Sequence, residues 1–253
     1  YLEENHSKVA VISLMWANNE TGVVTDIKAI TTLAKDFSIP VHSDAVAAFG
    51  HLPASFKDSG LAAMSISAHK LGGPVGIGAL IVSRATKLVS IIHGGGQERG
   101  MRSGTMNAPA AKAFALAAEI AVTTLDEERA RLAAIKKNLV EKTKTINASL
   151  GHTAEQADTL PNIVHLTLAG GSGDSLLFLL DQEGISVSTG SACQAGVNRP
   201  SHVLIAMGRT EDEAKGCLRV TLGHESTEAD IDALLASLPK AIESTLKAGL
   251  SSQ

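Results

Sequence analysis

The fold is decided by residues 9–44, which read VAVISLMWANNETGVVTDIKAITTLAKDFSIPVHSD. Residues 9–16 are a continuous apolar run of strand length, which is typical of a strand covered on both faces. Thr25 is the expected cap of a helix over residues 26–37. The apolar stripe of this predicted helix comprises Ile27, Ile30, Leu33, Ala34 and Phe37.

Three more strands are predicted in the first half of the chain, over residues 39–43, 61–68 and 77–83. Alternating strands and helices indicate an α/β layered domain. In such sheets, polar groups at the carboxyl ends of the strands gather around the ligand crevice. Asn19, Asp44 and Lys70 each follow or end a predicted strand, so we expect them near one site.

The second half begins within residues 110–146, which lack helix breakers and read as one long helix or two in tandem. We therefore place a domain junction near residue 125, giving domains at 1–125 and 126–253. Beyond it, the pattern predicts strands near residues 162–168, 186–188 and 218–222 and helices near residues 174–182 and from Ser226 or Thr227 onward. Thr210 and Glu213 have the spacing of a capping box.

Composition excludes several functional classes. The 253 residues carry a net charge of −4, which argues against general nucleic-acid binding. No apolar stretch approaches the ~18 residues of a membrane span, and we expect neither a membrane anchor nor a signal peptide. Two cysteines cannot form a disulfide framework, so we expect a reducing compartment and a cytoplasmic protein.

The strongest chemical signal is residues 67–78, which read SAHKLGGPVGIG. Here Lys70 follows a strand and precedes a glycine-rich turn that lets a ligand approach the backbone. Lysine forms Schiff bases with carbonyl compounds, including pyridoxal phosphate (PLP). Ser67 and His69 are placed to donate hydrogen bonds to a phosphate. A lone lysine on a turn is usually only a surface residue, but the neighbouring residues favour the functional interpretation.

Asp44 supports the same interpretation, since PLP needs a carboxylate on its pyridinium nitrogen to act as an electron sink. Asn19 is placed to bond a ring oxygen. Either residue alone would be read as a turn residue. The chain has no phosphate-binding P-loop and no dinucleotide fingerprint, and its histidines and cysteines lack the spacing of a metal site.

Two cysteines and one arginine complete the candidate set. Cys193 lies in a loop of small residues, where a mobile thiolate would reach a substrate; a buried structural cysteine is the alternative. For Cys217 we prefer the structural interpretation. Arg219 begins a predicted strand, and its guanidinium would bind a substrate carboxylate through two bonds or form a surface salt bridge.

Together these motifs resemble the cysteine desulfurases of the NifS/IscS type, which belong to the aminotransferase class V group of fold type I PLP enzymes. The resemblance is carried by residues 18–22 (NNETG), 42–45 (HSDA), 67–78, the loop 94–105 (GGGQERGMRSGT) and residues 190–193 (GSAC). It implies a three-layer α/β/α large domain, incomplete here, and a smaller α+β C-terminal domain with the cysteine loop.

The resemblance also implies roles by position. Lys70 would bind PLP covalently and Asp44 would pair with its ring nitrogen, while Asn19 would contact the ring hydroxyl and the substrate. Ser67 and His69 would hold the phosphate. Thr105 would reach the phosphate of a partner subunit in a homodimer. Cys193 would accept the sulfur of L-cysteine as a persulfide, and Arg219 would bind the substrate carboxylate.

The resemblance begins in mid-domain, so we expect a fragment that is inactive by itself. Ala47 stands where many relatives have glutamine, and His42 does not take the ring-stacking role. The alternatives are selenocysteine lyase, cysteine sulfinate desulfinase or a non-catalytic fragment. We expect the sulfur to go to an acceptor protein, such as an iron–sulfur scaffold, whose identity the sequence leaves open.

Overall fold

The computed structural model describes residues 1–190 and 200–250 and divides into two compact units. The first comprises Tyr1–Ala17 and Thr25–Leu125, and the second comprises Asn18–Val24 and Asp126–Gln253. The division after Leu125 falls within the long helical stretch. Residues 18–24, which the sequence placed in the first domain, pack with the second unit instead.

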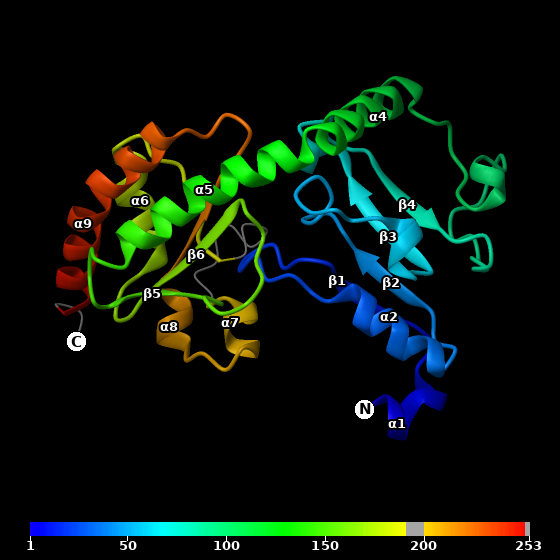
Figure 1. Cartoon of the computed structure of the whole chain (residues 1–253), viewed down its shortest axis with the longest axis horizontal. Coiled ribbons are helices and arrows are strands. Elements are labelled where there is room, and N and C mark those ends of the chain that lie inside the picture. The colour runs from blue at the N-terminus through cyan, green and yellow to red at the C-terminus, as the bar shows by residue number, and fades with distance from the viewer. Residues whose placement is uncertain (191–199, 251–253) are drawn as a thin grey trace. The chain divides into compact units, whose positions relative to one another are not determined.

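The first unit is built on a four-stranded sheet in the order β1-β2-β3-β4 (Figure 1). The strands are β1 (Ile12–Met15), β2 (Val41–Asp44), β3 (Ala63–Ser67) and β4 (Gly78–Val82). The first three run parallel, and β4 is antiparallel to β3. The helices are α1 (Leu2–Asn5), α2 (Ile27–Asp36), α3 (Phe56–Ser59) and α4 (Ala108–Thr123), with short 3₁₀ turns η1 (His6–Lys8), η2 (Ala68–Leu71) and η3 (Glu98–Gly100).

The helix α2 differs from its prediction in its cap and in its buried face. Its N-cap is Asp26 rather than Thr25, because the Asp26 carboxylate accepts the backbone N–H of Ala29 at 2.9 Å. Leu33 is 52% exposed, so its predicted place in the apolar stripe is wrong. The helix instead buries Thr31, whose hydroxyl donates to the Ser59 carbonyl at 2.6 Å.

The core of this unit lies between α2 and one face of the sheet. Its buried residues are Ile27, Ala34, Ile39, Val41, Ala45, Leu61 and Met64. Strand β1 was predicted to be covered on both faces, but Ser13 and Met15 are exposed. That prediction is wrong because only one face of β1 packs on the core, through Ile12 and Leu14, and alternate residues of a strand point to opposite faces.

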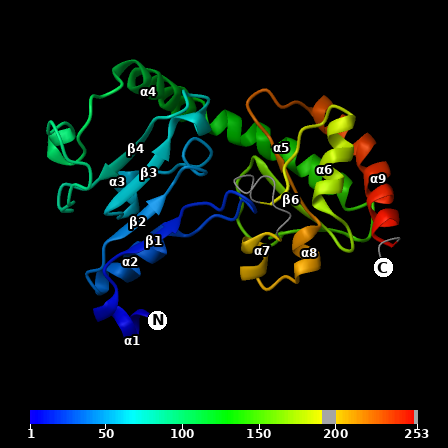
Figure 2. The same cartoon turned by 180° about the vertical axis from the view of Figure 1, so that it is seen from behind.

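The second unit is built on a three-stranded antiparallel sheet of order β5-β6-β7, which Figure 2 shows from behind. The strands are β5 (Leu150–His152), β6 (Ile163–Leu168) and β7 (Cys217–Thr221). The helices are α5 (Leu125–Thr143), α6 (Gly173–Gln182), α7 (His202–Ala206), α8 (Glu211–Lys215) and α9 (Glu228–Leu250). Alternate residues of β6 and β7 meet apolar residues of α5, α6 and α9 in one core.

The structure confirms two local predictions for this unit and contradicts a third. The tandem-helix reading is confirmed, since α4 and α5 are separate helices. The capping box of Thr210 and Glu213 is present at α8. The strand predicted over residues 186–188 is wrong, because only Ser188 forms a bridge, with Arg219. In this bridge, Ser188 and Arg219 each donate a main-chain N–H to the carbonyl oxygen of the other.

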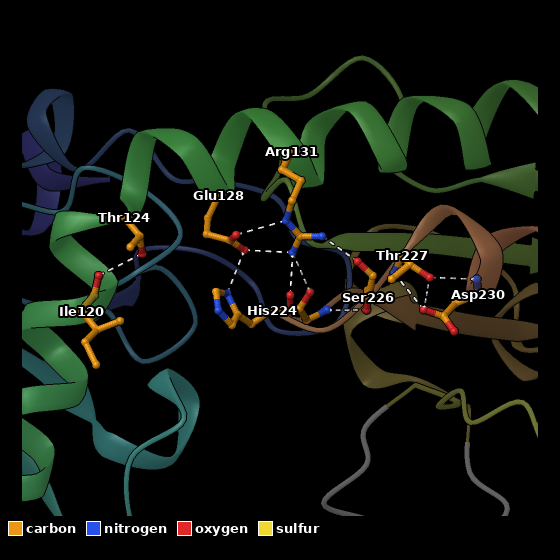
Figure 3. A network of polar contacts seen from close by, with 9 residues as sticks. Ile120, Thr124, Glu128, Arg131, His224, Ser226, Thr227 and Asp230 are labelled. Atoms are coloured by element: carbon orange, nitrogen blue, oxygen red, sulfur yellow. Dashed lines mark hydrogen bonds and ion pairs between the residues drawn. The ribbon is translucent and has the colours of Figure 1, made fainter.

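One arginine fastens α5 to the segment before α9 (Figure 3). Arg131 forms a bidentate ion pair with Glu128, in which Nε donates to Oε1 at 3.1 Å and Nη2 donates to Oε2 at 2.9 Å. It also donates to the carbonyl oxygens of Gly223, His224 and Ser226 at 2.6–3.1 Å. Because the guanidinium bonds both sides at once, it fixes where the chain enters α9.

No single helix in residues 1–190 and 200–250 is long and apolar enough to cross a membrane; α4 and α5 meet the length and composition criteria only as a bent pair.

Candidate active site

The carboxyl ends of two neighbouring parallel strands bring candidate residues of the first unit to one edge. Asp44 ends β2 and Ser67 ends β3, and Asp44 lies directly opposite Ser65 in the register. Alternate residues of a strand share a face. Asp44, Ser65 and Ser67 therefore lie on the same face of the sheet, opposite the core that packs against α2.

The turn after β3 presents Lys70. Residues His69 and Lys70 lie on η2 and are both exposed, and the Ser67 hydroxyl is 2.7 Å from His69 Nδ1. Gly72 ends the turn with a φ of 75°, a conformation that glycine adopts without strain. A Cβ on Gly73 would lie 2.9 Å from the Ala68 carbonyl oxygen, so this turn closes too tightly for a side chain.

A row of three polar side chains crosses the same face beside Asp44. The Ser13 hydroxyl is 2.8 Å from His42 Nδ1, and the Ser65 hydroxyl is 2.9 Å from His42 Nε2. His42 thereby links β1, β2 and β3 on the face that carries Asp44. The sequence did not predict this row, although the alternation of His42 and Asp44 along β2 was a signal of a polar face.

The second unit brings together the two predicted substrate-binding residues. Arg219 lies on β7, and its Nη1 donates to the main-chain oxygen of Asn19 at 2.9 Å. Asn19 belongs to a tight turn in which the Asn18 side-chain oxygen accepts the N–H groups of Glu20 and Thr21, each at 2.9 Å. The turn therefore holds the Asn19 carbonyl where it can receive the guanidinium.

His165 lies next to Arg219 on the same face of the small sheet. The two residues are register partners on β6 and β7. His165 is 2% exposed, its Nδ1 is 2.9 Å from the Thr153 hydroxyl, and burial and then the Arg219 charge lower its pKa to about 4. His165 is therefore neutral at neutral pH, which avoids a second positive charge beside the guanidinium.

Of the three remaining candidates, the structure describes Cys217 and Thr105 but not Cys193. Cys217 is buried, Gly190 N–H donates to its sulfur at 3.3 Å, and burial raises the pKa of its thiol. The structural interpretation of Cys217 fits this setting. Cys193 lies outside the described residues. Thr105 is exposed in the segment before α4.

The lysine with the most perturbed pKa is Lys136 of α5, which the sequence did not single out. Its ammonium donates to the Thr159 hydroxyl and the Leu160 carbonyl, both at 2.7 Å. Burial lowers its pKa to about 8. Both bonds tie α5 to the chain before β6, so we assign Lys136 a structural role. In the part of the chain that the structure describes, no three histidine, cysteine or acidic side chains are grouped to hold a metal.

Comparison with known proteins gives consistent matches along the chain. The family model "Aminotransferase class-V" matches residues 2–234. The chain is 48% identical over 248 residues to an IscS-like cysteine desulfurase from Mycobacterium tuberculosis. The alignment covers 98% of this chain and 63% of that protein. The chain spans less than two thirds of the length of the relatives it matches.

Solved structures agree with this match. A NifS-like protein from Rickettsia africae superposes with a TM-score of 0.88 at 33% identity, covering 96% of this chain and 65% of that one. A structure of SspA in complex with cysteine superposes with a TM-score of 0.68 at 31% identity, covering 88% of this chain and 62% of that one. The predicted fold class, that of fold type I PLP enzymes, is confirmed by these neighbours.

Proposed function

Because the chain belongs to the aminotransferase class-V family, we propose that the protein is a PLP-dependent cysteine desulfurase that converts L-cysteine to L-alanine. The observation that carries the proposal is the position of Lys70. It lies on a glycine-closed turn directly after β3, and Asp44 ends the parallel neighbouring strand. The 48% identity to an IscS-like cysteine desulfurase and the cysteine complex of a structural neighbour support the same substrate.

The chemistry of the donor set on the first unit fits PLP. An exposed amine at Lys70 is free to bind the aldehyde, and a carboxylate at Asp44 suits the pyridinium nitrogen. The paired Ser67 hydroxyl and His69 imidazole suit a phosphate. When bound, the cofactor withdraws electrons from the α carbon of an amino acid and so acidifies its proton.

The chain's own residues would then divide the work. The Lys70 amine accepts the α proton and later returns a proton to the product. Asp44 keeps the ring nitrogen protonated through its negative charge. Arg219, whose Nη1 already bonds the Asn19 carbonyl, uses its remaining donors for the substrate carboxylate, and the Asn19 side chain contacts the ring hydroxyl.

Cys193 is the proposed sulfur acceptor. Its thiolate attacks the substrate sulfur, and the bond between that sulfur and the β carbon breaks. The electron pair stays with the substrate carbon, which takes up a proton and leaves as alanine. The sulfur remains on Cys193 as a persulfide, from which an acceptor protein, such as an iron–sulfur scaffold, takes it.

We further propose that the protein is a cytoplasmic homodimer in which Thr105 reaches the phosphate site of the other subunit. The first unit exposes large apolar side chains that a partner surface would cover, including Val75, Val89 and Ile91, each more than four fifths exposed. The free thiol of Cys217 is compatible with a reducing compartment.

The test uses the whole polypeptide as it is produced in its own cell, which we call the native-length protein. We expect it to bind PLP with a borohydride-reducible link to Lys70 and to form equal amounts of alanine and Cys193 persulfide in a single turnover with L-cysteine. A Cys193→Ala variant should retain the link and lose alanine formation from L-cysteine. Retention of the reducible link in Lys70→Ala, or a protein that binds no PLP, would contradict the proposal.

A further inference from the structure

The second unit contains a buried carboxylate that is not among the proposed cofactor- and substrate-binding residues. Glu20 is 1% exposed, which is rare for a glutamate without a specific partner. Its partner is Ser201, whose hydroxyl donates to Glu20 Oε2 at 2.6 Å although the two residues are 181 positions apart. The mechanism above does not use either residue.

The carboxylate lies close to described residues on both sides of positions 191–199. Ser201 follows this segment and caps α7 by accepting the N–H of Leu204 at 3.3 Å. Gly190 precedes the segment, and a Cβ built there would lie 3.5 Å from Glu20 Oε2 and 3.2 Å from the Ser201 Cβ. Gly190 N–H also donates to the Cys217 sulfur. The residues on either side of positions 191–199 therefore converge on Glu20.

The same short turn also positions Arg219. Glu20 follows Asn19, whose carbonyl accepts the Arg219 guanidinium at 2.9 Å. The turn is itself fixed to the second unit, because Gly22 O accepts from Leu160 N at 2.8 Å and Val24 N donates to Asp158 O at 2.9 Å. Residues 19 and 20 thus connect the proposed carboxylate-binding arginine with Ser201.

We propose that Glu20 is a positioning residue for sulfur transfer, because it holds Ser201 and lies close to Gly190, described residues on either side of positions 191–199, and directly follows the Asn19 that bonds Arg219. This inference rests on the proposed function. Loss of the carboxylate would leave the proton of the buried Ser201 hydroxyl without its acceptor and would remove the side chain that lies close to both Ser201 and Gly190. The attack of Cys193 on the substrate sulfur depends on placement of the thiolate, whereas proton transfer at Lys70 does not.

Two substrates separate these steps. L-Cysteine needs the Cys193 thiolate to accept its sulfur. L-Cysteine sulfinate does not, because its carbon–sulfur bond breaks with the electron pair left on carbon and sulfur dioxide leaving, which water converts to sulfite. The ratio of alanine formation from the two substrates therefore reports on Cys193 placement and cancels changes in PLP binding and proton transfer.

The experiment compares Glu20→Ala, Glu20→Gln and Ser201→Ala in the native-length protein with Glu128→Ala. Glu128 is a matched control, since it is another glutamate of the second unit bonded to a specific partner, Arg131. We expect Glu20→Ala to lower the cysteine-to-sulfinate ratio by about tenfold through kcat, with KM for L-cysteine within about twofold. Glu20→Gln keeps an acceptor for Ser201 and should stay within about threefold of wild type.

A second readout needs no activity. Hydrogen–deuterium exchange should rise in Glu20→Ala in peptides that end at Gly190 and in those that begin at Pro200, and it should stay unchanged there in Glu128→Ala. An unchanged rate ratio in Glu20→Ala, or an equal fall of the ratio in Glu128→Ala, overturns the positioning role alone. Absence of alanine from both substrates with the wild-type protein overturns the proposed function and the positioning role together.

Discussion

Arg219 Nη1 donates to the main-chain oxygen of Asn19 at 2.9 Å, across 200 positions of the chain. The bond depends on the Asn19 carbonyl and not on its side chain. The position of the guanidinium and the chemistry of the Asn19 amide are therefore separable by mutation.

We expect Arg219→Lys to raise KM for L-cysteine by about tenfold, because an ammonium cannot make the two parallel bonds of a guanidinium to a carboxylate. Asn19→Ala should leave KM within about twofold of wild type, since the carbonyl that orients Arg219 remains, and should weaken PLP binding instead. Steady-state kinetics and a PLP titration of the native-length protein check both. Equal effects of the two variants on KM would contradict the separation.

Lys70→Ala should abolish the covalent link to PLP and reduce turnover by at least about a thousandfold, because it removes both the amine that binds the aldehyde and the base that takes the α proton. Borohydride reduction followed by peptide mass measurement checks the link. The exposed Lys57 of α3 is the control, and Lys57→Ala should keep link and rate. A reduced PLP adduct on a different lysine would show that Lys70 is misassigned.

Asp44→Asn should retain PLP on Lys70 but slow turnover by about a hundredfold or more, since a neutral amide no longer stabilises the protonated ring nitrogen. Asp36→Asn, at the exposed end of α2, serves as the matched control. Both variants are compared by cofactor content and by the rate of alanine formation. Wild-type rates in Asp44→Asn at full cofactor content would exclude its role at the ring.

His165 should make the protein less stable in mild acid. Its pKa is about 4 in the folded state against about 6.5 when exposed, so the unfolded chain binds the extra proton first as the pH falls. The stability that comes from neutral His165 is complete above pH ~6.5 and is lost as the pH falls toward ~4. Denaturant unfolding should show a loss of about 2 kcal/mol between pH 7.5 and pH 5, and His165→Gln should remove most of that pH dependence.

Arg131→Ala should lower the free energy of unfolding of the second unit by about 2 kcal/mol, because one change removes the Glu128 pair and three bonds to carbonyl oxygens before α9. Arg131→Lys should recover little, since an ammonium lacks the planar fork. Lys137→Ala is the control, because its pair with Glu141 is 3.9 Å long and exposed, and it should change stability by less than about 0.5 kcal/mol.

The sequence by itself determined the local elements of this protein. The apolar runs predicted β2, β3 and β6, the Thr210–Glu213 spacing predicted the capping box of α8, and the motif around Lys70 predicted a lysine on a glycine turn. Each of these features depends on residues within a few positions of one another. Local propensity and hydrogen bonding of that kind are present in the sequence itself.

Contacts between distant segments were decided only by the tertiary structure. Residues 18–24 leave the first unit to pack with the second, and Glu20 is buried because Ser201 meets it there. Leu33 is exposed, whereas Thr31 is buried where its hydroxyl finds the Ser59 carbonyl, which lies 28 positions away along the chain. A polar residue is buried when a partner reaches it, and the chain path that brings the partner is a property of the whole fold rather than of any local pattern.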